Sequence, residues 1–274
     1  MRSVLWVAGV ATAALLAGAA EAGQPYVGVE GGVGWARDND IDEVVDYQSD
    51  QPGIPPITAD QEYDDVFRIN YGKKGHEIGI VGGYDFGWLR LEGELRHMRT
   101  ALRHIDADDG ADAFLTSFNS TLNRPSFIPD PGSPGMGRLT TEDFDIDGNI
   151  SVSSAMVNAL LDINVAKRVS AYIGYGAGRS QVRAMGDKDS AWSWQRIFGI
   201  RYKLSDHIEL GTKFRMFNSG MVKLKHRPVT YAGNPDRIVD GGGTVNRTTN
   251  AVVVPEVEGA YRPRSWLATL TYSF

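Results

Sequence analysis

The chain has 274 residues, a formal net charge of −6 at pH 7, 32 glycines and no cysteine. This length suits one large all-β domain or two small domains. The lack of cysteine excludes disulfides and thiolate metal sites, and the acidic balance argues against a nucleic-acid partner, which needs a basic surface.

Residues 1–22 are typical of a secretory signal peptide. Arg2 supplies the positive start, Val4 to Ala17 form a short apolar stretch, and Ala20-Glu21-Ala22 matches the small-x-small cleavage pattern. A membrane-anchoring helix is the alternative, but the apolar run is short for a bilayer span. We therefore expect a cleaved signal peptide followed by a single domain, residues 23–274.

Alternation of apolar with polar or glycine residues predicts eight strands in the remaining chain. They are expected at residues 25–35, 74–86, 89–96, 150–163, 169–182, 191–203, 207–217 and 266–274. In the sixth strand, Arg196 falls on the apolar face, so its register is uncertain unless a β-bulge intervenes.

The connections between these strands form two groups. Three are long and without alternation, at about residues 37–67, 104–149 and 218–262, and the first is strongly acidic. Connections two-three, four-five and six-seven are short, and the one near Gly186-Asp187 is intermediate. Short turns at one end and long loops at the other are typical of an outer-membrane barrel, whose short turns face the periplasm.

Two of the long connections contain further patterned segments. Phe114, Phe118 and Leu122 recur every four residues, which indicates a short amphipathic helix. Ala251 to Val254 could form a small extra strand.

The last nine residues predict the strand that closes the barrel. Trp266, Leu270, Tyr272 and Phe274 share one face of this strand. A closing strand in a soluble sandwich is the alternative, but a terminal aromatic suits the boundary of a membrane. The predicted fold is all-β: an eight-stranded antiparallel up-and-down transmembrane β-barrel with short periplasmic turns and long extracellular loops, located in the cell outer membrane.

Charged side chains are expected to fill the barrel. The inward positions carry Glu30, Arg90, Glu92, Glu94, Arg96, Arg201, Glu209, Lys213 and Arg215. Because the interior of an eight-stranded barrel is just wide enough for side chains, these charges predict an internal ion-pair network. A narrow porin-like channel that passes small solutes or ions through the charged interior is the alternative.

The chemistry of enzymes and cofactors finds little support. His97 lies near the rim on the lipid-facing side, but no serine is tied to it in sequence, so we expect no enzyme and no cofactor. Asp143, Asp145 and Asp147 open like a calcium loop, although Ser154 stands where the closing carboxylate belongs. They are a weak metal candidate, and the acidic loops could bind divalent cations.

Several stretches resemble the OmpA-like outer-membrane β-barrel family. They are PYVGVEGG at 25–32, GYDFG at 83–87, MVNALLD at 156–162, AYIGYGAG at 171–178, AWSWQ at 191–195, RYKLSD at 201–206 and the TYSF ending. The resemblance implies insertion by the outer-membrane assembly machinery, which reads the last strand, and roles in structure, adhesion or small-solute passage. No peptidoglycan-binding domain follows the barrel, so tethering to the cell wall is not implied.

These observations predict a structural or surface-interaction role for the long acidic loops. The expected partners are outer-membrane lipid, lipopolysaccharide and the assembly machinery. We expect a monomer.

Overall fold

The computed structural model describes residues 23–36, 39–50, 58–71, 74–124, 137–144, 148–225, 227–240 and 243–274. The predicted signal peptide, residues 1–22, lies outside the described residues. Within these ranges, no helix combines the length and the apolar character needed to cross a membrane.

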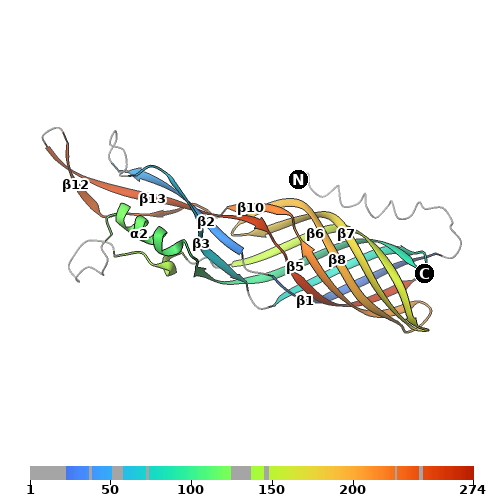
Figure 1. Cartoon of the computed structure of the whole chain (residues 1–274). Helices are drawn as coiled ribbons and strands as arrows, with labels where there is room; N and C mark the ends of the chain where they lie inside the picture. Colours follow the sequence, from blue (N-terminus) through green and yellow to red (C-terminus); the bar gives the residue numbers. More distant parts are fainter. Residues whose placement is uncertain are drawn as a thin grey trace.

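Eight antiparallel strands close into a barrel, which confirms the predicted fold (Figure 1). They are β1 (Gln24–Trp35), β4 (Gly75–Asp85), β5 (Leu89–Ala107), β6 (Gly148–Ala166), β7 (Val169–Ala184), β8 (Asp187–Lys203), β9 (Ile208–Asn218) and β14 (Arg264–Ser273). Neighbouring strands pair in the order β5, β4, β1, β14, β9, β8, β7, β6, and β6 pairs back with β5.

The stagger of the ring sets the tilt of its strands. Following paired residues around the barrel from Trp192 on β8 leads back to Tyr202 on the same strand, ten residues further on. A stagger of this kind tilts barrel strands by roughly 35–45° from the axis. Residues paired across strands therefore descend step by step around the barrel.

The outer face of the barrel is an apolar belt. Side chains such as Val29, Ile78 and Ile173 are about half exposed or more, whereas their inward neighbours are buried. Exposed aromatic residues occur at both ends of this belt. Those near the short turns are Trp88, Tyr202, Tyr272 and Phe274, and those at the opposite end include Trp192 and Trp266. Two such girdles mark the two interfaces of a membrane.

The sixth barrel strand, β8, needs no bulge to place Arg196. The pairing of β8 with β7 and β9 is regular throughout, and Arg196 points outward with its guanidinium 5.2 Å from the Trp194 ring centre. A long cationic side chain on the lipid-facing side can extend along an aromatic ring toward the interface. The sequence alternation was therefore right, and the suspected register irregularity is absent from these described strands.

The connection between β7 and β8 is tighter than expected. Only Met185 and Gly186 separate the two strands, and both have positive φ angles, 53° and 83°. A two-residue hairpin with positive φ at both positions matches the twist of the flanking strands. This end of the barrel therefore carries one tight hairpin beside the long connections.

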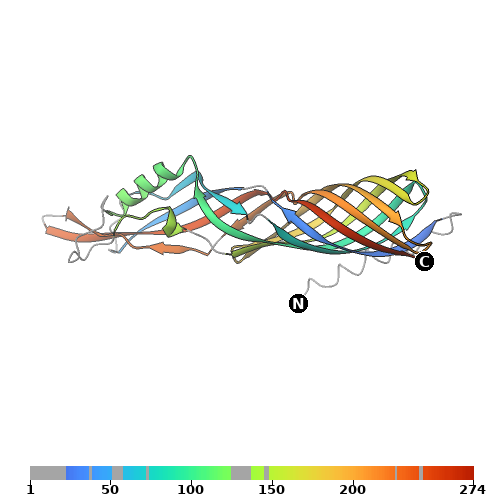
Figure 2. The ribbon, with the colours of Figure 1, turned by 90° about the horizontal axis from the view of Figure 1, so that it is seen from below.

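The first and third long connections are mostly β-structure in their described residues, which corrects the expectation of irregular loops there. Their strands are β2 (Asn39–Ser49), β3 (Gln61–Tyr71), β10 (Met221–Lys225), β11 (Val229–Tyr231), β12 (Pro235–Asp240) and β13 (Gly243–Ala260). From the upper part of β5 the sheet continues through β3 and β2 to β13, which also pairs with β10, β11 and β12. We call this sheet the extension; Figures 1 and 2 show it continuing the long axis of the barrel. The suggested small strand at 251–254 is the middle of β13.

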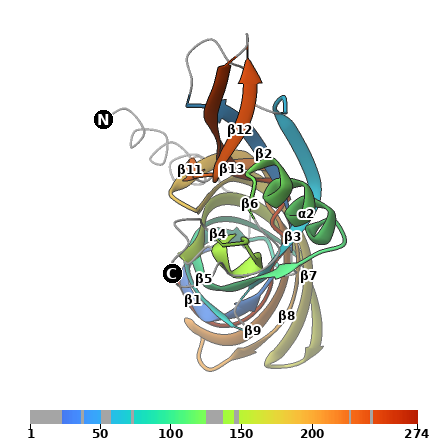
Figure 3. The same cartoon turned by 90° about the vertical axis from the view of Figure 1, so that its left-hand side faces the viewer.

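A helix packs against the extension as the sequence predicts. α2 (Ala111–Thr121) buries Phe114 and Phe118, which contact Phe144 of the short helix η1 (Thr141–Phe144). In the end-on view of Figure 3, η1 projects onto the opening of the ring. One hydrophobic cluster joins these aromatic residues to Met98, Met156 and other side chains of the barrel strands. The extension and the top of the barrel therefore share one core, which we call the upper core.

Candidate functional site

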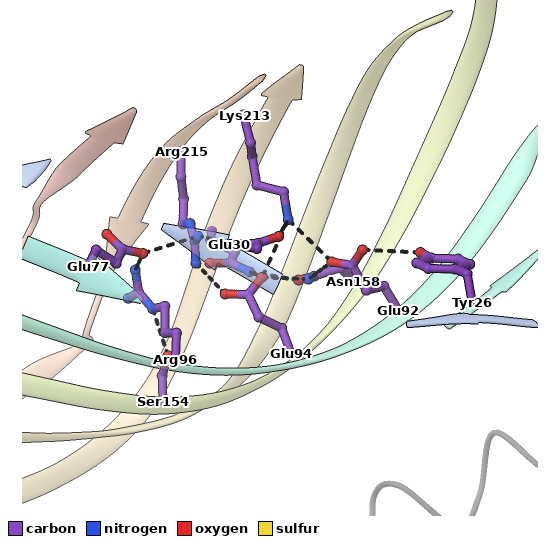
Figure 4. A network of polar contacts seen from close by, with 11 residues as sticks. Tyr26, Glu30, Glu77, Glu92, Glu94, Arg96, Ser154, Asn158, Lys213 and Arg215 are labelled. Atoms are coloured by element: carbon purple, nitrogen blue, oxygen red, sulfur yellow. Dashed lines mark hydrogen bonds and ion pairs between the residues drawn. The ribbon is translucent and has the colours of Figure 1, made fainter. Parts of the chain in front are cut away.

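The middle of the barrel holds an ion-pair network drawn from four strands (Figure 4). The Lys213 ammonium contacts Glu30 and lies 3.4 Å from Glu92 Oε1. The Arg215 guanidinium contacts Glu94 and lies 3.0 Å from Glu30 Oε2. All five side chains are buried, with at most 6% of the residue surface exposed. Each strand supplies its charges at every second position, so alternation alone turns them inward.

Arg96 and Glu77 continue this network toward the upper core. Glu77 accepts a hydrogen bond from Arg96 Nη1 at 3.0 Å, and its Oε1 lies 3.1 Å from Arg215 Nη2. Arg96 also donates to Ser154 Oγ at 2.8 Å, and its guanidinium lies 3.8 Å from the Phe217 ring centre. Glu77 was not among the inward charges predicted from the sequence, although alternation from Ile78 turns it inward.

Uncharged polar side chains also donate hydrogen bonds to the carboxylates of this network. Asn158 Nδ2 donates to Glu92 and Glu94 at 3.1 and 3.0 Å, and Gln195 Nε2 donates to Glu94 at 3.1 Å. Tyr26 donates its hydroxyl hydrogen to Glu92 at 3.1 Å. The amide and hydroxyl groups of these donors carry no charge, so the pattern of inward charges did not identify them. Buried charges need such partners as well as counter-ions.

A second cluster of charges lies at the end with the short turns. Arg90 Nε and Arg201 Nη2 lie 2.7 and 3.0 Å from the two oxygens of Asp162. Arg201 also contacts Glu209 at 2.7 Å and Asp85 at 3.6 Å. A cavity of about 430 Å³ opens here, lined among others by Asp85, Lys167, Arg201 and Glu209. The nine charges predicted to face inward thus form two neighbouring groups, a buried middle group and a wetter periplasmic group.

Among the described residues, one group of carboxylates has the spacing of a metal site. Single oxygens of Glu30, Glu92 and Glu94 lie within 4.8 Å of one another. The ammonium of Lys213 contacts Glu30 and lies within 4.0 Å of the other two. A side-chain cation therefore already supplies the positive charge that this group of carboxylates requires.

The calcium-like segment is described only in part. Asp143 Oδ2 accepts hydrogen bonds from the backbone N–H and hydroxyl of Thr140, at 2.7 and 3.1 Å. This is a local cap at the start of η1. Asp145 and Asp147 lie outside the described residues. Divalent binding by this segment stays a prediction.

The upper core closes the barrel above the ion pairs. Met98, Met156 and Phe217 are buried in the same cluster as Phe114 and Phe118 of α2. β10 covers the mouth as well: Lys223 N–H donates to Asp189 at 3.0 Å, and Lys225 N–H donates to Asp187 at 3.1 Å. Apolar packing thus follows directly above charged packing along the barrel axis.

Removing both carboxylates that hold β10 should loosen this cover. In Asp187→Ala/Asp189→Ala, we expect trypsin to cleave after Lys223 and Lys225 faster than in the parent protein. The loss is about 0.5–1 kcal/mol per hydrogen bond, because these carboxylates are partly exposed. Asp206→Ala in a periplasmic turn is the control, and equal cleavage rates in all three proteins would contradict this role.

Acidification should have the same effect. Backbone hydrogen bonds from Lys223 and Ser190 lower the pKa of Asp189 below its ordinary value of 3.8. Its contribution is therefore complete above pH 3.8 and is lost as the pH falls through the lowered value. Cleavage by an acid-active protease should rise in that window in the parent protein and change less in the double variant.

His97 has a serine partner that the sequence did not reveal. Its Nδ1 lies 2.9 Å from Ser153 Oγ across paired positions of β5 and β6, on the outer face. A serine and a histidine at this distance are two members of a hydrolytic triad. No carboxylate contacts this histidine in the part of the chain that the structure describes, so the group that would orient its ring is missing.

The residues of the closing strand lie where the sequence places them. Trp266, Leu270, Tyr272 and Phe274 point outward from β14 and are about half exposed or more. β14 pairs with β1 on one side and β9 on the other. The Phe274 N–H donates to the Pro25 carbonyl at 3.1 Å, which joins the two ends of the domain.

Three solved proteins are similar to this chain. The chain is similar to Neisserial surface protein A (NspA) at 12% identity and a TM-score of 0.37, covering 93% of this chain and 100% of that one. It is similar to Ail of Yersinia pestis, solved with the heparin analogue sucrose octasulfate, at 10% identity and a TM-score of 0.29, covering 88% and 99%. It is also similar to the outer membrane protease OmpT of Escherichia coli, at 6% identity and a TM-score of 0.34, covering 92% and 97%.

No match was found among curated proteins. A family model described as the outer membrane protein beta-barrel domain matches residues 3–223. Because this match spans well over half of the 274 residues, the chain belongs to the outer-membrane β-barrel domain family.

Proposed function

We propose that this outer-membrane barrel is a closed anchor that presents the extension at the cell surface for contact with other molecules. The observation that carries the proposal is the double closure of the barrel, first by ion pairs and then by the upper core. The predicted signal peptide and the likeness to OmpA-like barrels fit this location. The proposal includes no catalytic step.

The closure leaves little room for a solute. Lys213 and Arg215 each contact carboxylates from at least two strands, so their side chains cross the lumen. An ion passing through the barrel would have to separate these ion pairs. Leaving a buried charge without its partner costs several kcal/mol of free energy. Above them, an ion would have to pass between apolar side chains such as Met98 and Met156.

The extension has the properties of a contact platform. Its sheet is continuous with the barrel through the pairing of β3 with β5, and α2 stiffens it by aromatic packing. The exposed positions of β2, β3 and the residues beside them are strongly acidic: Asp46, Asp50, Asp60, Glu62 and Asp64. Such a surface favours cationic partners and speeds their encounter at low ionic strength.

Conductance in planar bilayers tests the proposal. We expect no steady current from the refolded protein, because both closures are part of its folded core. A steady current that changes in Glu92→Gln, with Asp206→Asn as the exposed control, would instead support the narrow channel.

A further inference from the structure

We propose that the outer face of β4 to β8, at the upper edge of the apolar belt, binds the phosphate groups of an anionic glycolipid in the outer leaflet. The strand register arranges the outward side chains of these five strands in three rows. The top row is Lys188, Arg183, Ser151, Arg99 and His76; the second is Ser190, Gln181, Ser153, His97 and Ile78; the third is Trp192, Arg179, Ala155, Leu95 and Ile80. We call this surface the basic collar.

The rows of the collar slant with the strands, so their β8 end lies higher along the barrel axis than their β4 end, and the collar crosses from polar into apolar surface. Its top row is polar throughout, its third row is mostly apolar, and the rows below it continue the apolar belt. Trp192, 72% exposed, sits in the third row where an interfacial aromatic residue is expected. A ligand of this surface would therefore meet cationic side chains beside hydrocarbon.

All charged side chains of the collar are positive. Its rows contain Arg99, Arg179, Arg183 and Lys188, all exposed, and no carboxylate. Among the described residues, none of these four side chains forms an ion pair with an acidic residue. The Arg183 guanidinium donates to the Gln181 amide oxygen at 3.5 Å. Arg179 donates to the Ser190 carbonyl at 3.4 Å, and its guanidinium lies 5.8 Å from the centre of the Trp192 ring. In a protein of net charge −6, this is a local concentration of available cations.

A phosphorylated lipid fits both the cationic side chains of the collar and the apolar surface beside them. A guanidinium presents paired N–H donors that match two phosphate oxygens, and such charge-assisted bonds are stronger than neutral ones. Arg183 and Arg99 lie two strands apart, about 9–10 Å, so both can reach one large headgroup. The apolar rows below offer a surface for acyl chains, which a soluble polyanion would leave unused. The collar therefore attracts anionic lipid at the membrane surface, whereas the exposed acidic residues of the extension would repel it.

Titration of the folded protein in detergent micelles tests the proposal, with the fluorescence of its tryptophans as the signal. The probes are bis-phosphorylated lipid A, the same lipid without phosphates, and inositol hexakisphosphate as a soluble polyanion. We expect the parent protein to prefer the phosphorylated lipid over both other probes. Arg99→Gln/Arg183→Gln should weaken this binding about tenfold or more, because two bidentate contacts are lost.

The control removes two charges from the other membrane face. Lys167→Gln/Arg168→Gln lies in an exposed periplasmic turn and should bind the phosphorylated lipid like the parent protein. Equal binding by the Arg99/Arg183 variant and the parent would overturn the proposal, as would equal binding of the lipid with and without phosphates. Tighter binding of inositol hexakisphosphate would overturn the choice of a lipid. Heat-dependent gel migration checks folding, and Arg183→Gln alone replaces the double variant if that variant does not fold.

Discussion

Replacing Arg215 by methionine should lower the free energy of unfolding of the barrel by about 3–5 kcal/mol, the usual result of removing one partner from a buried ion pair. Arg215 contacts Glu30, Glu77 and Glu94, more carboxylates than its neighbour Arg96 contacts. Methionine is also a long, unbranched side chain, but it leaves each of these three carboxylates without its contact to the Arg215 guanidinium. Urea unfolding of the refolded protein, followed by tryptophan fluorescence, measures the change.

The balance of charges predicts how a second substitution acts. The middle network has four carboxylates, Glu30, Glu77, Glu92 and Glu94, and three cations, Arg96, Lys213 and Arg215. Arg215→Met raises the excess of negative charge, whereas Glu94→Gln removes it. We therefore expect Glu94→Gln to cost less than Arg215→Met, and the double variant to be more stable than Arg215→Met alone.

An exposed arginine supplies the matched control. Arg196→Met makes the same chemical change on the outer face and should alter stability by only about 0.5 kcal/mol, as surface substitutions usually do. If Arg215→Met unfolds at the same urea concentration as the parent, the middle network would not hold the barrel together.

The barrel could be predicted from the sequence because alternate residues of a strand face lipid and lumen. Those facing lipid are mostly apolar, whereas those facing the lumen can be polar or charged. Ile78 and Ile80 face outward while Glu77 faces inward, and Leu91 and Leu95 likewise face outward beside the inward Glu92 and Glu94. The same contrast identified the inward charges. It did not identify which charges pair, because Arg90 meets Asp162 from a strand 72 residues away in sequence. Pairing of that kind depends on register and tilt.

The extension could not be predicted in the same way. In β2, Val45 and Tyr47 alternate with exposed Asp46 and Gln48, but the pattern is too short to stand out from a loop. In β3, Asp65 takes a positive φ of 50°, which interrupts the period of two. β13 pairs with β2 across some 200 residues of chain, and no local pattern records such a partner. In the extension, apolar side chains pack against α2 and neighbouring strands. Neither face of its sheet is therefore uniformly buried or uniformly exposed.

Changing the last residue, Phe274→Asp, should reduce the amount of folded protein in membranes far more than it reduces the stability of barrels that do fold. Phe274 is 63% exposed on the outer face, and its ring packs edge-on against Tyr272 with centres 5.3 Å apart. One aromatic side chain accounts for at most about 1.5–3 kcal/mol of burial. The backbone bond from its N–H to Pro25 does not depend on the side chain.

We expect assembly to be the step at which this residue has the larger effect. Resemblance to OmpA-like barrels implies that the insertion machinery reads the closing strand, so a charge at its end acts before the barrel forms. The measurement compares the heat-modifiable folded band in membranes with the urea midpoint of the same variant refolded in detergent. Phe274→Leu keeps an apolar end and should behave like the parent protein in both assays. Normal membrane levels of folded Phe274→Asp would show that the machinery does not depend on this residue. An equal loss in membranes and in refolding would assign its role to stability alone.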